Sequence, residues 1–202
     1  MSDKKRLTSP KGVAVWPKVN EPDTKFDVKG IFSCGLRMSA ASAAPMIATL
    51  TQMYDEYYAS EVRDAKKKLK KCDLPWKECT NDSGNPTGEI EFKFKLTAKI
   101  DTKDGRTIEQ RPILFDAKMR PMNDRVGGGS IVRIGFEPNL WNVPATGVGM
   151  TLRLKAVQVI ELKEFGGRTA KDFGFSEEEG FETAFTEDQP EESGDVVDGK
   201  QF

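Results

Sequence analysis

Apolar and polar side chains alternate without a break in Ile90-Glu-Phe-Lys-Phe-Lys-Leu-Thr-Ala-Lys-Ile100. Successive side chains of a β-strand point to opposite faces, so a period of two predicts a strand with one buried face. The apolar residues then face a core, and the polar face carries Lys93, Lys95 and Lys99. This stretch therefore predicts both a strand and a cationic outer surface.

The chain on either side repeats this alternation in shorter pieces. Further strands are predicted over 12–16, 32–39, 107–115, 131–136 and 150–162. Pro17 is expected to end the first of them. The other basic residues on the polar faces are Arg37, Arg133, Arg153 and Lys155. Turn residues predict loops over 73–88 and over 137–149.

Between the second and third predicted strands the period changes to that of a helix. Apolar residues recur at steps of three and four from Met46 to about Leu69, after possible helix-start residues from Ser39 to Ser42. Lysines gather at the expected helix end, at Lys66, Lys67, Lys68, Lys70 and Lys71. The helix macrodipole favours cations there, so they form either a solvated helix end or an accessory contact for nucleic acid.

Five or so strands with one helix between the second and third predict a mainly β fold, an OB-like five-stranded barrel rather than a doubly wound α/β sheet. Residues 1–171 hold 30 Lys and Arg against 21 Asp and Glu, a charge of +9. Residues 172–202 hold eleven carboxylates against one lysine, a charge of −10, and few aliphatic residues. We therefore predict a folded cationic domain over 1–171 and a disordered acidic tail over 172–202.

The composition excludes several kinds of chemistry. The chain has no histidine, so it can form no Ser-His-Asp or Cys-His arrangement and has no imidazole base. Its three cysteines lack metal-type spacing, which favours plain thiols in a reducing compartment. No apolar run approaches a membrane span, and no signal peptide is visible. We predict no enzyme activity, metal or cofactor; a carboxylate-metal nuclease is the alternative.

The basic outer faces of several strands suggest a groove that follows a nucleic-acid backbone. Lysines and arginines there would neutralise successive phosphates and release counterions. The predicted contacts are Lys18, Arg37, Lys93, Lys95, Lys99, Arg133, Arg153 and Lys155. The alternative is that these residues only solvate the strands and protect their edges.

Binding of single strands also needs flat side chains on which bases stack. Trp141 stands in a polar predicted loop and is the first candidate. Trp16 is the second, because Val13 and Val15 point to one face and leave it on the other with Ala14 and Lys18. Either tryptophan can instead be a packing residue at the rim of the barrel.

The acidic tail combines carboxylates with phenylalanines and ends on Phe202. Carboxylates imitate phosphates and phenyl rings imitate bases, so the tail is expected to occupy the groove until DNA displaces it and frees it for a protein partner. The residues expected to bind that partner are Glu187, Asp188, Glu191, Glu192, Asp195, Asp198 and Phe202. The alternatives are a merely solubilising tail, or a protein-interaction protein whose tail caps a basic partner.

Several pieces in fixed order resemble one family. They are Glu91-Phe-Lys-Phe-Lys95, Gly127-Gly-Gly-Ser130, Leu140-Trp-Asn142, Leu152-Arg-Leu-Lys-Ala-Val-Gln-Val-Ile-Glu-Leu162 and Phe165-Gly-Gly167. From about residue 88 to 167 the chain looks like the T-seven-type bacteriophage single-stranded DNA-binding proteins. The first 87 residues match only loosely.

The resemblance implies an OB-fold that coats single-stranded DNA in phage replication, recombination and repair, in the cytoplasm of the infected host. It also implies a homodimer, and a tail that competes with DNA and recruits the replicative DNA polymerase and the helicase-primase. Trp141 would lie in the loop between the fourth and fifth barrel strands. Whether duplex DNA also binds stays open, because phosphate contacts serve both forms.

Overall fold

The computed structural model describes residues 5–25, 27–65, 68–102 and 104–163, together with Ser176 and Gly180. The chain divides into two units, Met1–Gly167 and Arg168–Phe202. Every helix and strand of the described ranges lies in the first unit. The residues of the predicted partner-binding tail lie outside the described residues, and the predicted boundary after Lys171 stays a prediction.

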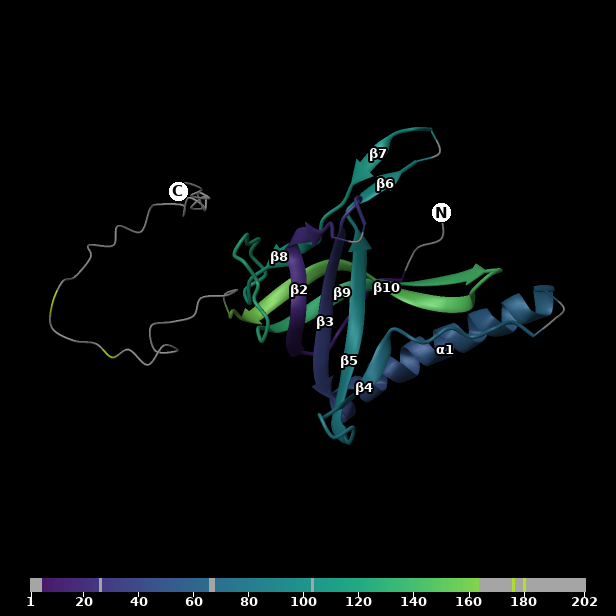
Figure 1. The fold of residues 1–202 in the computed structure, drawn as a ribbon, viewed down its shortest axis with the longest axis horizontal. Helices are drawn as coiled ribbons and strands as arrows, with labels where there is room; N and C mark the ends of the chain where they lie inside the picture. The colour runs from purple at the N-terminus through teal and green to yellow at the C-terminus, as the bar shows by residue number, and fades with distance from the viewer. Residues whose placement is uncertain are drawn as a thin grey trace, which may run out of the picture. The chain divides into compact units, whose positions relative to one another are not determined.

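The described elements are β1 (Leu7–Thr8), β2 (Gly12–Asp23), β3 (Ile31–Ser39), α1 (Ala40–Ala65), β4 (Trp76–Thr80), β5 (Pro86–Thr97), β6 (Lys99–Asp101), β7 (Thr107–Glu109), β8 (Ile113–Phe115), β9 (Ile131–Val143) and β10 (Gly147–Glu161). Five strands pair in a closed cycle, in the order β2, β3, β5, β10, β9 and back to β2. All these pairs are antiparallel except β5 with β10 (Figure 1). The predicted mainly β, OB-like fold, with one helix after the second barrel strand, is confirmed.

The alternation of apolar and polar residues in the strands determines which side chains form the core. Phe92 and Phe94 of β5 are fully buried, and Phe94 meets Phe136 of β9 edge to face at 5.1 Å between ring centroids. Each such side chain contributes about 1.5–3 kcal/mol through its burial. Leu152 and Leu154 of β10 close the inner face. The polar residues between them consequently point away from the core.

Helix α1 continues directly from β3. The Ser39 hydroxyl accepts a hydrogen bond from the Ser42 backbone N–H at 3.3 Å, which caps the first turn as the sequence predicts. Met46, Leu50 and Tyr54 are buried at steps of four and pack against the barrel. In the described ranges, no helix combines the length and apolar character that crossing a membrane requires.

The predicted lysine-rich helix end is wrong, because α1 ends at Ala65. The segment 68–72 runs back along the helix instead: the Tyr58 hydroxyl donates to the carbonyl of Leu69 at 2.8 Å. The ammonium of Lys71 lies 4.5 Å from the Tyr58 ring centroid and 3.2 Å from an Asp55 carboxylate oxygen. Lys71 therefore fastens this segment to α1, while Lys66 and Lys67 lie outside the described residues.

Two predicted loops contain strands. The range 73–88 holds β4 and the start of β5, and Trp76 of β4 covers Phe92 at 5.9 Å between ring centroids. The range 137–149 belongs to a β9–β10 hairpin. Proline at 138 is tolerated because no described strand pairs with the other edge of β9 beyond Phe136.

Two strand boundaries also differ from the prediction. β2 does not end at Pro17 but continues to Asp23, after a bulge in its pairing with β3. The predicted strand 107–115 is divided into β7 and β8, because Pro112 cannot donate a ladder hydrogen bond. β7 pairs with β6 in a separate hairpin, which projects from the end of β5 that lies away from α1 (Figure 1).

The end of the β9–β10 hairpin, residues 139–150, is called the arm. It runs beside α1 (Figure 1), with the segment 68–72 joined to it by backbone hydrogen bonds. Val148 donates to Lys70 at 2.9 Å and accepts from Cys72 at 2.8 Å and from the Tyr54 hydroxyl at 3.0 Å. These contacts hold the arm against α1 and the segment 68–72.

Candidate nucleic-acid interface

One row of side chains crosses the outside of the barrel from β2 to β9. Register pairs Lys18 with Ser33, Ser33 with Lys95, Lys95 with Arg153, and Arg153 with Glu137. Directly paired residues share a face of the sheet, and neighbouring strands lie about 4.8 Å apart. The row therefore brings together three predicted cations that are far apart in the sequence.

A second row lies beside the first. Gly35 of β3 pairs with Lys93 of β5 on one side and with Val15 of β2 on the other. A Cβ at Gly35 would lie 3.0 Å from the Val15 carbonyl oxygen, so any larger residue there would require β2 to move by a few tenths of an ångström. The two rows without Glu137, together with Thr151, which lies two residues before Arg153 on β10, are called the outer face: Val15, Lys18, Ser33, Gly35, Lys93, Lys95, Thr151 and Arg153.

The cations in the middle of the outer face have no acidic partner. Among the described residues, no carboxylate lies within 4.0 Å of the charged groups of Lys93, Lys95 or Arg153. Burial, and then the charge of Lys93, lower the pKa of Lys95 below its ordinary value. An anion placed between these side chains would relieve that repulsion, which is what a phosphate-binding surface needs.

Other predicted cations are already engaged. Arg37 contacts Glu91 at 2.9 Å, Lys99 contacts Glu109 at 3.3 Å, and Lys155 contacts Glu137 at 3.4 Å. Arg133 donates to the carbonyl of Ser9 at 3.2 Å, four residues along β9 from Glu137 and away from both rows. The structure thus gathers Lys18, Lys93, Lys95 and Arg153 and leaves the other predicted contacts at the periphery.

Trp141 lies on β9, in the arm, and not in the predicted loop. Its indole N–H donates to the hydroxyl of Thr151 at 3.1 Å. The ring lies against Gly149 of β10, its direct partner across the hairpin, where a Cβ would come within 2.2 Å of the ring. Only glycine leaves room for this placement, which holds the half-buried ring beside the outer face.

Trp16 is presented differently. The pairing of β2 with β3 steps from Val15 to Lys18, which inserts one extra residue, and Trp16 in this bulge has φ = 46°. That left-handed conformation is uncommon for a bulky residue. Ala14, which precedes the bulge and pairs with Leu36, is buried, whereas the bulge leaves Trp16 83% exposed, so the two residues do not share the expected face. Trp16 is therefore free to contact a ligand.

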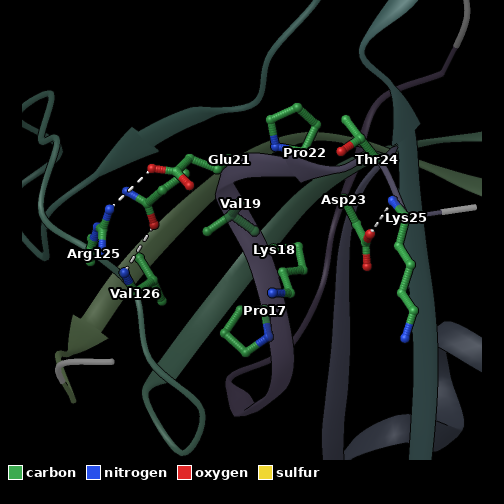
Figure 2. Close-up of a pocket in the computed structure, with 11 residues that line it drawn as sticks. Pro17, Lys18, Val19, Glu21, Pro22, Asp23, Thr24, Lys25, Arg125 and Val126 are labelled. Atoms are coloured by element: carbon green, nitrogen blue, oxygen red, sulfur yellow. Dashed lines mark hydrogen bonds and ion pairs between the residues drawn. The ribbon is translucent and has the colours of Figure 1, made fainter. Parts of the chain in front are cut away.

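The second half of β2 lines a pocket together with Arg125 and Val126 (Figure 2). Asn20 closes one side: its carbonyl oxygen accepts from the Val126 backbone N–H at 3.0 Å, and its amide donates to the Asp124 carbonyl at 2.9 Å. Arg125 contacts Glu21 at 3.1 Å. The hydrogen bonds of Asn20 and the ion pair of Glu21 hold in place the part of β2 that follows Trp16.

The sequence did not predict three features of this surface. They are the packing of Trp141 against Gly149, the hydrogen bond between Trp141 and the Thr151 hydroxyl, and the absence of a described acidic partner at Lys93, Lys95 and Arg153. Each depends on which residues face one another across strands, and no local pattern gives that register. Among the described side chains, no three Cys, Asp or Glu converge to hold a metal ion. The expectation that the chain uses no cofactor stays a prediction.

The family model described as "Single-stranded DNA-binding protein, Bacteriophage T7" matches residues 12–162. Comparison with the sequences of curated proteins finds no match. Among solved structures, the bacteriophage T7 single-stranded DNA-binding protein gp2.5 has a TM-score of 0.68 at 23% identity, with 79% of this chain and 93% of that chain covered.

A second similar structure is the single-stranded DNA-binding protein of bacteriophage Enc34 in complex with single-stranded DNA. It has a TM-score of 0.57 at 13% identity, and the match covers 82% of this chain and 91% of that chain. At these identities the structures show a shared fold. The family match spans β2 to β10 and hence the whole barrel with its outer face, so the chain belongs to the family of T7-type bacteriophage single-stranded DNA-binding proteins.

Proposed function

We propose that this protein coats single-stranded DNA without sequence preference during phage replication, recombination and repair. The observation that carries the proposal is the cluster of Lys93, Lys95 and Arg153, which have no described acidic partner, on the same outer face as the exposed Trp16 and beside the half-buried Trp141. Phosphates would lie along Lys18, Lys95 and Arg153, with Lys93 beside them, and bases would stack on Trp16 and Trp141. None of these phosphate and stacking contacts reads a base edge, so this part of the binding would be independent of sequence.

The relatives support this assignment. The Enc34 protein, which has the same fold, has been solved in complex with single-stranded DNA. The outer face lies on the strands and the strand 4–5 hairpin that OB-folds use for oligonucleotides. The peripheral cations would then raise the positive electrostatic potential around the groove more than they contact DNA directly. They are Arg37, Lys99, Arg133 and Lys155.

The acidic tail is the proposed regulator. Its charge of −10 opposes the +9 of residues 1–171, so it would compete with DNA for the outer face. When DNA displaces it, the tail would recruit the phage replicative DNA polymerase and the helicase-primase. We further propose that the protein is a homodimer, has no catalytic activity, and acts in the cytoplasm of the infected bacterium.

The test is a tryptophan-quenching titration with oligo-dT, on the full chain and on a chain ending at Lys171, at low and moderate salt. The expected result is quenching in both, with tighter and salt-dependent binding by the truncated chain. Absence of quenching in either form would overturn the proposal and favour a protein-interaction role. Cleavage of the oligonucleotide after addition of Mg²⁺ would contradict the non-catalytic assignment.

A further inference from the structure

A hollow of about 190 Å³ opens beside the paired cations Lys95 and Arg153. Its walls come from β3, β5, β9 and β10 and from the foot of the β6–β7 hairpin. Ile31 and Ile100 give it an apolar surface, and Ile100 is 38% exposed. A partly open apolar surface in the middle of a cationic face is unusual for a surface that only contacts phosphates.

Two amide side chains line the same hollow. The amide of Gln110 donates to the Thr97 carbonyl at 3.1 Å, which fixes its orientation and leaves its carbonyl oxygen unused by that bond. No described residue hydrogen-bonds to the side chain of Asn139, which faces Thr151 across the β9–β10 pair. The hollow thus combines apolar contact with hydrogen-bonding groups, a lining suited to a flat heteroaromatic ring with a polar edge.

We propose that this hollow is a subsite for one nucleotide of the bound strand, with its phosphate between Lys95 and Arg153 and its base against Ile31 and Ile100. The base edge meets the amides of Asn139 and Gln110. Charge complementarity selects the occupant, because the two cations at the mouth have no described acidic partner. The inference rests on the proposed function and gives the β6–β7 hairpin a role as one wall of the DNA site.

This subsite adds a base-dependent contribution to the binding energy, besides the stacking on Trp16 and Trp141 and the electrostatic contacts with phosphates. An apolar contact with a base is insensitive to salt, whereas phosphate contacts weaken as salt rises. Removal of the apolar wall should therefore lower the affinity at every salt concentration by the same factor. It should have no effect on a strand that has phosphates but no bases.

The experiment compares Ile100→Ala with Ile113→Ala in the full chain. Ile113 of β8 is 56% exposed and does not line the hollow, so it is a control with the same chemical change. Each variant and the unmodified protein are titrated with oligo-dT and with an abasic strand of equal length, at three salt concentrations. Asn139→Ala is a second probe, and thermal unfolding checks that each variant is folded.

The expected result is a roughly fivefold weaker binding of oligo-dT by Ile100→Ala, with an unchanged salt slope and no loss on the abasic strand. Equal affinities of the Ile100 and Ile113 variants, with Asn139→Ala also unchanged, would overturn the subsite and leave the proposed function intact. A loss that is the same on both strands would also overturn it. Failure of the unmodified protein to bind oligo-dT would instead refute the proposed function, and the subsite with it.

Discussion

The middle of the outer face and its periphery carry the same kinds of residue but in different electrostatic states. Lys93, Lys95 and Arg153 have no described carboxylate within 4.0 Å, whereas Arg37, Lys99 and Lys155 each contact one. An exposed ion pair is worth at most about 1 kcal/mol, so a DNA phosphate can displace the carboxylate from its cation. The displaced carboxylate then stays nearby as an uncompensated negative charge and repels the phosphate. The number of basic residues on a face is therefore a poor measure of its capacity for DNA.

The largest expected effect comes from neutralising the middle of the face. Lys93→Gln with Lys95→Gln should lower the slope of log affinity against log salt by about 0.7 for each lost phosphate contact. Two contacts correspond to a loss of affinity on the order of 25-fold at 0.1 M salt. The measurement is a series of oligo-dT titrations from low to moderate salt.

The charge-matched control is Arg37→Gln with Lys99→Gln at the periphery. It removes the same net charge from residues that already have acidic partners, so the salt slope should stay unchanged. Equal slopes for the two double variants would erase the distinction between paired and unpaired cations.

The tryptophans extend the comparison from charge to stacking. Trp141→Ala should weaken binding about tenfold, because stacking on an aromatic ring is worth about 1–3 kcal/mol per base. Gly149→Ala should have a similar effect, since its Cβ would occupy the space of the ring. Affinity for oligo-dT and the melting temperature are both measured, and unchanged affinity in a folded Trp141→Ala protein would remove Trp141 from the site.

Replacement of Trp16 should lower the affinity for DNA less than replacement of Trp141, and it should stabilise the fold. A bulky residue with φ = 46° carries backbone strain that glycine does not have. Trp16→Gly should therefore raise the melting temperature by about 2 °C and weaken DNA binding about fivefold. Trp16→Phe is the control, which keeps the ring and the strain; a lower melting temperature for Trp16→Gly would show that the bulge is not strained.

The sequence predicted those parts of the molecule that depend on local alternation. Phe92, Phe94, Val132, Ile134 and Phe136 are buried as expected, because a period of two directly reports one face of a strand. The context of Trp141 was predicted wrongly, since nearby proline, asparagine and glycine indicate a loop as readily as an exposed hairpin. The ion pairs of Arg37 and Lys155 depend on cross-strand register, which has no local signal.

The smallest expected effect on DNA binding concerns Glu137 at the end of the cationic row. Burial raises the pKa of Glu137, but contacts with Arg6 and Lys155 outweigh this and hold the pKa below its ordinary value of 4.5. A depressed pKa stabilises the fold fully above about pH 4.5 and loses this contribution as the pH falls through the folded-state pKa. Glu137→Gln should therefore melt at a lower temperature than the unmodified protein at pH 7, and this difference should shrink in acid. Its affinity for oligo-dT at pH 7 should rise by no more than about twofold, because Lys155 is released beyond the end of the row. A larger gain would mean that the DNA path continues past Arg153 onto β9, and that the periphery binds phosphate once its carboxylate is removed.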